Sequence, residues 1–155
     1  MEIAPTAACP CGSRFSYATC CAPIHVAPGR APTPEALMRA RFSAFVLADN
    51  DFLIASWAPE TRPSRAELGE PGPHWRRLIV EASEHGADQG WVRFRAIARQ
   101  PDGWLALDET SRFRHADGQW YYLDGDAEWQ RLRVGRNAPC PCGSGFKAKR
   151  CCGRD

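Results

Sequence analysis

The first third of the chain carries apolar residues at helical spacing, whereas the second half is rich in β-branched and aromatic residues. The helical positions are Leu37, Met38, Phe42, Phe45 and Phe52. Their spacing predicts a helix over residues 34–48 and a shorter one over residues 51–57. Thr33 followed by Pro34 is a typical helix start, because threonine caps free amide groups and proline fits the first turn.

Strands are expected after Pro73. The segments that read as strands are residues 78–80, 91–97, 104–114 and 120–123. Pro101-Asp102-Gly103 and Asp117-Gly118 indicate tight turns between the later strands. Before them, Ser64 and Glu67 form a capping-box pattern that predicts one more turn of helix. Helices followed by four antiparallel strands define an α+β domain.

Composition and size are those of one ordinary folded domain with small appendages. The chain has 155 residues, of which 44% are hydrophobic and 25% are charged. Its apolar runs are far shorter than the ~20 residues of a membrane span. Residues 1–5 lack the basic and apolar parts of a secretory signal, so we expect a cytoplasmic protein with no membrane partner.

All eight cysteines belong to an internal repeat. Cys9-Pro10-Cys11-Gly12-Ser13 returns as Cys140-Pro141-Cys142-Gly143-Ser144, and Cys20-Cys21 returns as Cys151-Cys152, each 131 residues later. Four thiols in so short a stretch are what a tetrahedral Zn²⁺ site needs. The repeat therefore predicts two zinc sites, with every cysteine as a ligand.

The local chemistry of each repeat suits a metal site. Pro10 stiffens the chelating turn, and Gly12 allows the chain to turn so that amide groups point at sulfur. Ser13 is a good helix N-cap, so about two helical turns are expected to return Cys20 and Cys21 to the metal. Iron–sulfur ligation, disulfides and a redox C-x-C pair are the alternatives, although known iron–sulfur runs have wider spacings and vicinal disulfides are strained.

These ends divide the chain into three parts. Residues 1–24 form an N-terminal module, 25–134 a central domain and 135–155 a C-terminal module. The Pro-, Gly- and Ala-rich segment 23–34 is expected to be a linker.

Positive charge is concentrated at the C-terminal end. Residues 131–155 contain seven basic residues and one acidic residue, a net charge of +6, so the rest carries −4 of the total of +2. Lys147, Lys149 and Arg150 lie between the cysteines of the second repeat, where the first has Ser16 to Thr19. We therefore expect these three residues to face a partner with an anionic surface, and the first repeat to be a structural staple.

Two resemblances follow from these motifs. The segment from Cys140 to Cys152 resembles the SEC-C motif, the zinc-binding tail of the protein-translocation ATPase SecA, although that pattern ends in cysteine and histidine rather than in Cys151-Cys152. The whole chain resembles the bacterial YchJ family through its two end motifs, residues 34–42 and residues 109–113. This resemblance implies a nuclear-transport-factor-2-like, or cystatin-like, cone in which a curved sheet wraps a helix around a pocket, and such cones often dimerise.

Three residues are candidates for such a pocket. Arg41 lies one helical turn from Leu37 and Phe45, Trp57 ends the second helix, and Glu109 shares a strand face with apolar residues. A buried glutamate needs a partner, and Arg41 is the natural one. The pair is either structural or part of a ligand or catalytic site. Many YchJ-like sequences have histidine before that glutamate, whereas this chain has Asp108, which removes an attractive general base.

Three functions are compatible with the sequence. The first is a non-enzymatic zinc-binding adaptor that docks a protein or ribonucleoprotein partner, such as a chaperone, a nascent chain or a ribosome. The second is a small enzyme or small-molecule binder that uses the pocket. The third is zinc storage or sensing, which would not require the large central domain. Four-thiolate sites have no open coordination position, so hydrolytic zinc catalysis is disfavoured.

Overall fold

The computed structural model describes residues 2–69 and 72–154. The helices are α1 (Ala22–Val26), α2 (Pro34–Leu47), α3 (Asn50–Ala55) and α4 (Arg65–Leu68), and the strands are β1 (His74–His85), β2 (Gln89–Gln100), β3 (Gly103–Ala116) and β4 (Gln119–Leu132). Short 3-10 turns lie at Tyr17–Thr19, Pro28–Arg30, Ala148–Arg150 and Cys152–Arg154. Helices followed by four strands confirm the α+β class.

Side-chain caps fix where the helices begin. The Thr33 hydroxyl accepts a hydrogen bond from the Ala36 amide, and the Asp49 carboxylate accepts one from the Phe52 amide. Ser64 caps α4 by accepting from the Glu67 amide, as the capping-box pattern predicts. These local signals explain why the helix starts could be predicted from the sequence.

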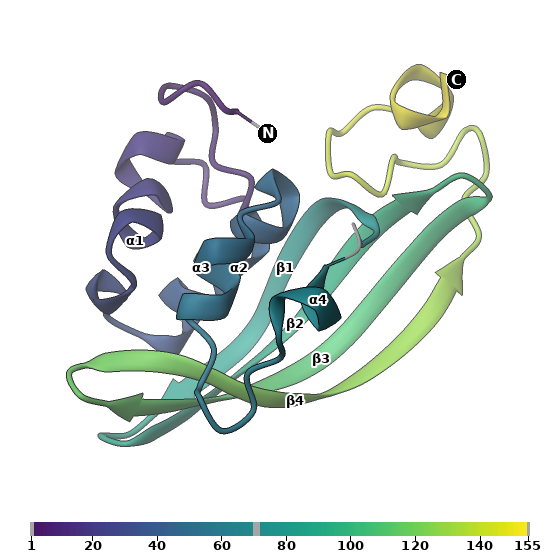
Figure 1. Ribbon diagram of the computed structural model, residues 1–155. Helices are drawn as coiled ribbons and strands as arrows, with labels where there is room; N and C mark the ends of the chain where they lie inside the picture. The colour runs from purple at the N-terminus through teal and green to yellow at the C-terminus, as the bar shows by residue number, and fades with distance from the viewer. Residues whose placement is uncertain (1, 70–71, 155) are drawn as a thin grey trace.

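The sheet is an antiparallel meander in the order β1-β2-β3-β4. In the register, Phe94 lies opposite Glu109 and Ala96 lies opposite Leu107 and Leu78, so these residues share one face. The helical layer covers that face at one end of the long, curved strands (Figure 1). Glu109 is thereby placed on the side of the sheet that α2 packs against.

The segment expected to be a linker is part of the core instead. Residues 22–26 form α1, and Ile24 and Ala31 are buried in the main hydrophobic cluster with Leu37 of α2. The prediction was wrong because Pro, Gly and Ala also suit a compact chain of short helical turns, where small side chains allow close packing.

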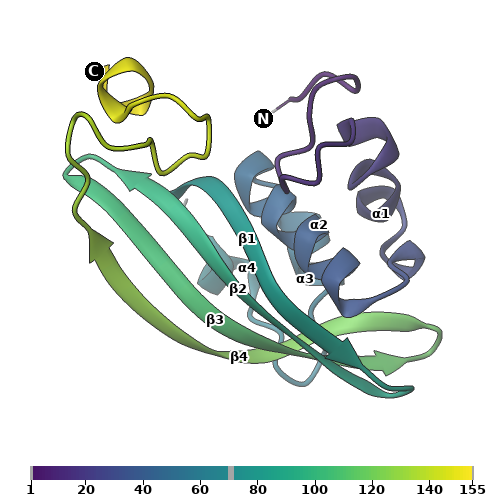
Figure 2. The same cartoon turned by 180° about the vertical axis from the view of Figure 1, so that it is seen from behind.

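A second, smaller cluster lies on the other face of the sheet. Ile97 follows Ala96 along β2 and therefore points the opposite way. It packs with Trp104 and with Cys140 of the C-terminal module. The view from behind shows this module beside the far ends of the strands, well separated from α1–α3 (Figure 2). The two cysteine-rich ends thus pack into different hydrophobic clusters, on opposite faces of the sheet.

The last strand continues well beyond the predicted residues 120–123, to Leu132. Its second half is mostly exposed, and its polar side chains hide the apolar alternation on which the prediction relied. Backbone pairing with β3 holds it in place, and Arg112 of β3 pairs with Asp124 and Asp126 across the two strands.

Among the described residues, none of the helices combines the length and the hydropathy that crossing a bilayer requires.

Candidate metal centres and the pocket between helix and sheet

Four cysteines near the N-terminus bring their sulfur atoms together. The Sγ atoms of Cys9, Cys11, Cys20 and Cys21 all lie within 4.8 Å of one another. The sulfurs of Cys11 and Cys20 are 3.6 Å apart, and those of Cys20 and Cys21 are 4.0 Å apart. Zn–S bonds of ~2.3 Å in a tetrahedron place sulfurs about 3.8 Å apart. This cluster, site 1, therefore has the donors and the spacing of a four-thiolate metal centre.

The C-terminal cysteines form an equivalent cluster, site 2. Cys140, Cys142, Cys151 and Cys152 also have all Sγ atoms within 4.8 Å of one another. The sulfurs of Cys142 and Cys151 are 3.5 Å apart, and those of Cys151 and Cys152 are 4.0 Å apart. All eight cysteines are free thiols. Both groups could therefore hold a metal ion.

The sequence repeat is also a structural repeat. The Cys9 amide donates to the Phe15 carbonyl at 2.9 Å, and the Cys140 amide donates to the Phe146 carbonyl at 2.8 Å. Isolated bridges and 3-10 turns recur at the same offset of 131 residues. The same short motif thus builds the same sulfur cage at each end of the chain.

The path between the second and third cysteines differs from the expectation of two helical turns. Ser13 caps no helix: its hydroxyl accepts from the Phe15 amide and lies 3.1 Å from the Cys20 sulfur. The chain returns through an extended bridge and the single 3-10 turn Tyr17–Thr19. The tighter path brings the serine hydroxyl to the sulfur, where it can stabilise a thiolate.

Site 1 is held by α2. The Ser43 hydroxyl donates to the Cys21 sulfur at 3.3 Å and lies 3.5 Å from the Cys9 sulfur. The Arg39 guanidinium donates to the Cys11 carbonyl at 3.0 Å and places a cation beside the cluster. A four-thiolate zinc centre carries a formal charge of −2, so these contacts are the outer shell that such a centre requires.

Without a cation the thiols compete for protons. Hydrogen bonds from Cys11 and Cys21 hold the pKa of Cys9 well below its usual range, and the same cluster raises the pKa of Cys21. Burial raises the pKa of Cys20 to about 11 and, in site 2, that of Cys152 to about 12. Deprotonation of all four thiols in a site therefore needs a compensating positive charge.

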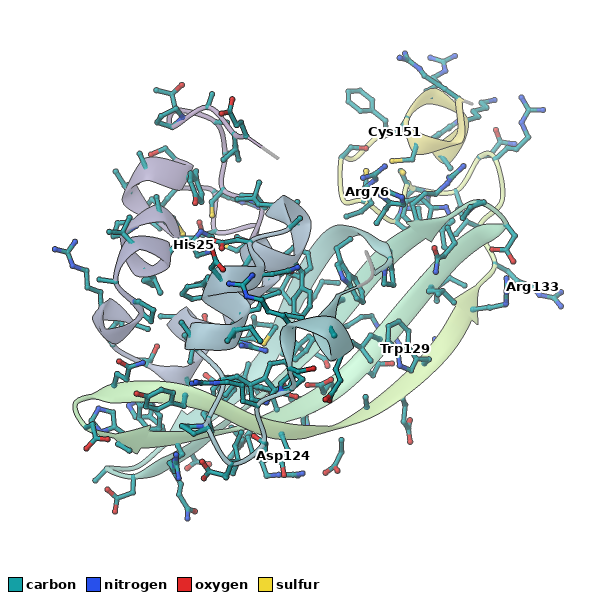
Figure 3. The ribbon with its side chains drawn as sticks, viewed as in Figure 1. His25, Arg76, Asp124, Trp129, Arg133 and Cys151 are labelled. Atoms are coloured by element: carbon teal, nitrogen blue, oxygen red, sulfur yellow. The ribbon has the colours of Figure 1, made fainter. Side chains whose placement is uncertain are left out.

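The two sites differ in depth. Cys9, Cys11 and Cys21 are buried in the main core, with exposed fractions of 4%, 0% and 1%. In site 2 only Cys140 is buried, while Cys151 and the two other cysteines are half-buried. Figure 3 shows Cys151 in the module that stands at the margin of the fold. Site 1 is thus integral to the domain, and site 2 is peripheral to it.

Both modules approach the edge strand β1. A Cβ added to Gly12 would lie 3.7 Å from the Leu78 carbonyl oxygen, and one added to Gly143 would lie 3.0 Å from Nε of Arg77. Both glycines have φ near 80°, which L-residues with side chains rarely adopt. The two repeats therefore meet adjacent residues of the same strand.

The expected docking residues lie at the surface of the C-terminal module. Lys147 and Arg150 are exposed and Lys149 is half-buried. Within the described part of the chain none of the three forms an ion pair. Phe146 beside them is 64% exposed. The module thus presents uncompensated cations around an exposed aromatic ring.

The three pocket candidates line one cavity of about 700 Å³ between α2 and the sheet: Arg41, Trp57 and Glu109. Arg41 is only 3% exposed, and its Nη1 donates to the Leu53 carbonyl and to the Ser56 hydroxyl. The fold thus brings together a residue of α2, a residue of β3 and Trp57, which lies beyond the end of α3 at Ala55 and not at the end of a helix as predicted.

The expected pairing of Arg41 with Glu109 does not occur. Among the described residues no ion pair joins them. The Arg41 guanidinium instead lies over the rings of Trp57 and Tyr122, at 4.8 and 4.4 Å from their centroids. Burial lowers the pKa of Arg41 to about 10. Cation–π contacts with these two rings thus take the place of the expected ion pair with the carboxylate.

Glu109 has a different partner. Its carboxylate accepts a hydrogen bond of 2.5 Å from the Ser111 hydroxyl, two residues along the same face of β3. A Cβ at Gly125 of β4 would lie 2.5 Å from this carboxylate. Because glycine has no side chain, it leaves room for the Glu109 carboxylate. Glu109 is held toward β4, and the cation and the carboxylate remain separate.

Sequence reasoning missed several residues of these sites. Nothing in the sequence indicated that Ser43 contacts site 1, apart from its position on the buried face of α2. Tyr122, Trp75 and Trp129 line the pocket. Trp129 rises from the part of β4 that the prediction omitted (Figure 3). A longer β4 would have indicated it, because Trp129 lies opposite Leu107 on the inner face.

The histidines lie outside both sulfur cages. His25, in the helical layer (Figure 3), shares a hydrogen bond of 2.6 Å with the Tyr17 hydroxyl and one of 2.7 Å with the Ala40 carbonyl. Both ring nitrogens are thus engaged. His74 and His85 are exposed, and His115 is half-buried against Trp120.

Comparison with known proteins agrees with this architecture. Residues 33–125 match the family model of the YchJ middle NTF2-like domain, and residues 136–154 match the SEC-C motif. UPF0225 proteins from three serotype O1 strains of Vibrio cholerae are 41% identical over 150 residues, which cover 94% of this chain and 99% of theirs.

Two solved structures are similar. A SEC-C motif containing protein from Rhodopseudomonas palustris has a TM-score of 0.67 and 32% identity, covering 79% of this chain and 99% of that one. Another from Psychrobacter arcticus has a TM-score of 0.63 and 30% identity, covering 97% of both chains. The expected NTF2-like fold is confirmed.

Proposed function

This chain belongs to the YchJ family, and we propose that it is a zinc-binding protein whose C-terminal module docks a partner with an anionic surface. The observation that carries the metal part is the pair of four-thiol clusters, whose sulfur spacings of 3.5–4.0 Å suit a tetrahedral ion. The docking part rests on the exposed cations of site 2.

Zinc suits these donors better than other common metals. Four thiolates are soft ligands, and Zn²⁺ takes them in a closed tetrahedral site with no redox chemistry. The Ser43 hydroxyl at site 1 and the Ser144 hydroxyl at site 2 donate to sulfur, as outer-shell groups do. Four thiolates leave no open position for a substrate, which supports a structural role rather than a catalytic one.

Docking by the C-terminal module is supported by its contrast with the N-terminal one. Site 1 is buried in the core, so a zinc ion there would stabilise the fold of the domain by cross-linking the N-terminal segment. Both modules expose a phenylalanine, Phe15 at 67% and Phe146 at 64%, but only Phe146 is followed by a cluster of cations, which includes the exposed Lys147 and Arg150. An aromatic ring that can enter a pocket, ringed by cations, is the usual anatomy of a binding hot spot.

The partner we propose is a cytoplasmic protein or ribonucleoprotein. The cations sit within an end segment of net charge +6, so attraction to an acidic protein surface or to phosphates would steer association. Such attraction weakens as salt screens it.

The test is capture of partners from native extract by a triple variant in which Lys147, Lys149 and Arg150 are replaced by alanine. The matched control replaces Arg30, Arg65 and Arg93, which are exposed elsewhere. We expect both variants to retain zinc and stability. Capture should fall in the triple variant and in a chain that ends at Val134, but not in the control, and wild-type capture should fall with added salt.

Capture that survives the triple variant but disappears when Phe15 and Tyr17 are replaced on an intact fold would contradict the proposal. It would assign docking to the N-terminal module, where Phe15 is 67% exposed.

A separate observation favours a second function, binding of a small molecule. The cavity of about 700 Å³ beside Arg41, Trp57 and Glu109 is of ligand-binding size and mostly apolar, with a few polar groups.

A further inference from the structure

The cavity between α2 and the sheet contains a buried cation that forms no ion pair with any described residue. Arg41 is 3% exposed and lines the cavity. A guanidinium has five N–H donors, and only Nη1 has acceptors here, the Leu53 carbonyl and the Ser56 hydroxyl. Among the described residues the N–H groups of Nε and Nη2 have no acceptor. They form the fork that binds a carboxylate with two parallel hydrogen bonds.

A second donor in the same cavity also has no partner. The indole Nε1 of Trp57 is buried and makes no hydrogen bond. Trp57 lines the cavity and its ring lies 4.8 Å from the Arg41 guanidinium carbon. A buried donor without an acceptor costs about 1–3 kcal/mol, so the wall beside Arg41 holds a second polar group whose hydrogen-bonding capacity is not met among the described residues.

The charges of the cavity favour an anion. Among the described lining residues the cations are Arg41 and the exposed Arg76, and the only carboxylate is that of Glu109. Glu109 is held by Ser111 and packed against Gly125, so its charge acts on Arg41 without a direct ion pair. The described lining thus has one more positive than negative charge.

Much of the remaining apolar wall is aromatic and favours a flat ligand. Trp75 lies over Trp129 with ring centroids 5.9 Å apart and 32° between the planes, and Phe42 packs beside Trp75. Trp129 remains 52% exposed, at the open side of the cavity. Aromatic rings gain free energy by stacking on such walls beyond their area burial.

We propose that this cavity binds a planar aromatic carboxylate, with its carboxylate on the free N–H groups of Arg41 and its ring against the aromatic wall. This inference rests on the second function proposed above, binding of a small molecule by the cavity.

The test compares two probes of the same shape, 2-naphthoate and its neutral amide 2-naphthamide, by calorimetry and tryptophan fluorescence with the zinc-loaded full chain. We expect 2-naphthoate to bind at least about tenfold more tightly than 2-naphthamide, because only the carboxylate forms charge-assisted hydrogen bonds with Arg41. Arg41→Lys should weaken the binding of 2-naphthoate and leave the affinity for 2-naphthamide nearly unchanged. The reason is that lysine keeps the positive charge but lacks the paired N–H groups of the guanidinium. Trp129→Ala should weaken both.

Glu109→Gln supplies a control of opposite sign that does not depend on altering the buried arginine. Removing the one lining carboxylate should tighten 2-naphthoate about threefold or more without affecting 2-naphthamide. Equal affinities of the two probes for the wild type, or weaker 2-naphthoate binding by Glu109→Gln, would overturn the ligand class while leaving a small-molecule site. Binding of neither probe would overturn both proposals.

Discussion

The hydroxyl of Ser43, at the centre of α2, donates a hydrogen bond to the sulfur of Cys21 at 3.3 Å. Ser43 has no exposed surface, and Cys21 is 1% exposed. The longest helix of the described chain is thus joined directly to the first sulfur cluster. This contact couples the N-terminal cysteine cluster to the packing of the central domain.

Ser43→Ala should lower the affinity of site 1 for zinc. Loss of an outer-shell hydrogen bond typically costs about 10–100-fold in metal affinity. Competition with a chromogenic chelator would measure it, with Ser16→Ala as the control, because the Ser16 side chain bonds to Thr19 and not to sulfur. Equal affinities for both variants would show that the Ser43 contact does not support the metal.

Replacing the first cysteine pair should damage the protein more than replacing the second. Cys9→Ser with Cys11→Ser, and Cys140→Ser with Cys142→Ser, should each release one of two zinc ions. Zinc binding to such modules supplies ~10–16 kcal/mol of folding free energy. Because site 1 lies in the main core, only its loss should lower the melting temperature of the central domain strongly.

Elemental analysis and calorimetry would measure both effects. Iron in the purified protein, or paired disulfides with no metal, would refute the zinc assignment. Equal melting temperatures of the two double variants would refute the difference in structural role.

Glu109→Ala should cost little stability, whereas Arg41→Ala should cost about 2–4 kcal/mol. Glu109 has no buried cation as a direct partner, so its removal breaks only the bond from Ser111. Removal of Arg41 leaves a cavity and removes one of the two donors to the Leu53 carbonyl, the other being the Ser56 hydroxyl. Urea unfolding measures both changes. A loss for Glu109→Ala as large as that for Arg41→Ala would indicate that the two side chains pair in solution.

Tyr122 should make the protein less stable at high pH. Burial, followed by the charge of Glu109, raises the pKa of Tyr122 to about 12. In the unfolded chain the phenol ionises near pH ~10. The raised pKa means that this contribution to stability is complete below pH ~10 and is lost as pH rises toward 12.

Unfolding in urea at a series of pH values would measure this loss. Tyr122→Phe keeps the ring over Arg41 but has no phenol to ionise, so its stability should decline less over the same interval. Identical slopes for the two proteins would contradict the raised pKa.

Much of the fold was predictable because its signals are local. Thr33 before Pro34, and Ser64 before Glu67, satisfy free amides within one turn, so no distant residue decides those helix starts. The duplicated cysteine spacing likewise predicts two sulfur clusters, since each module closes on itself through hydrogen bonds between near neighbours.

Where the prediction was wrong, a distant partner decided the outcome. Arg41 was matched to Glu109 by charge, but Trp57 and Tyr122 flank the guanidinium, and Ser111 holds the carboxylate. Segment 23–34 has the composition of a linker, yet Ile24 is buried against α2.

The sequence by itself thus determined the element types and the two four-cysteine motifs, because short-range hydrogen bonds and side-chain spacing set both. The sequence also predicted a structural first repeat, but only the tertiary structure gave the depth of each site, with site 1 in the main core and site 2 at the margin. It also decided that Ser43 meets Cys21 and that Arg41 lines a cavity without an ion-pair partner among the described residues. These features depend on how α2 packs on the curved sheet and on the N-terminal module. Such packing brings together residues that are far apart along the chain, and no local sequence pattern indicates that they will meet.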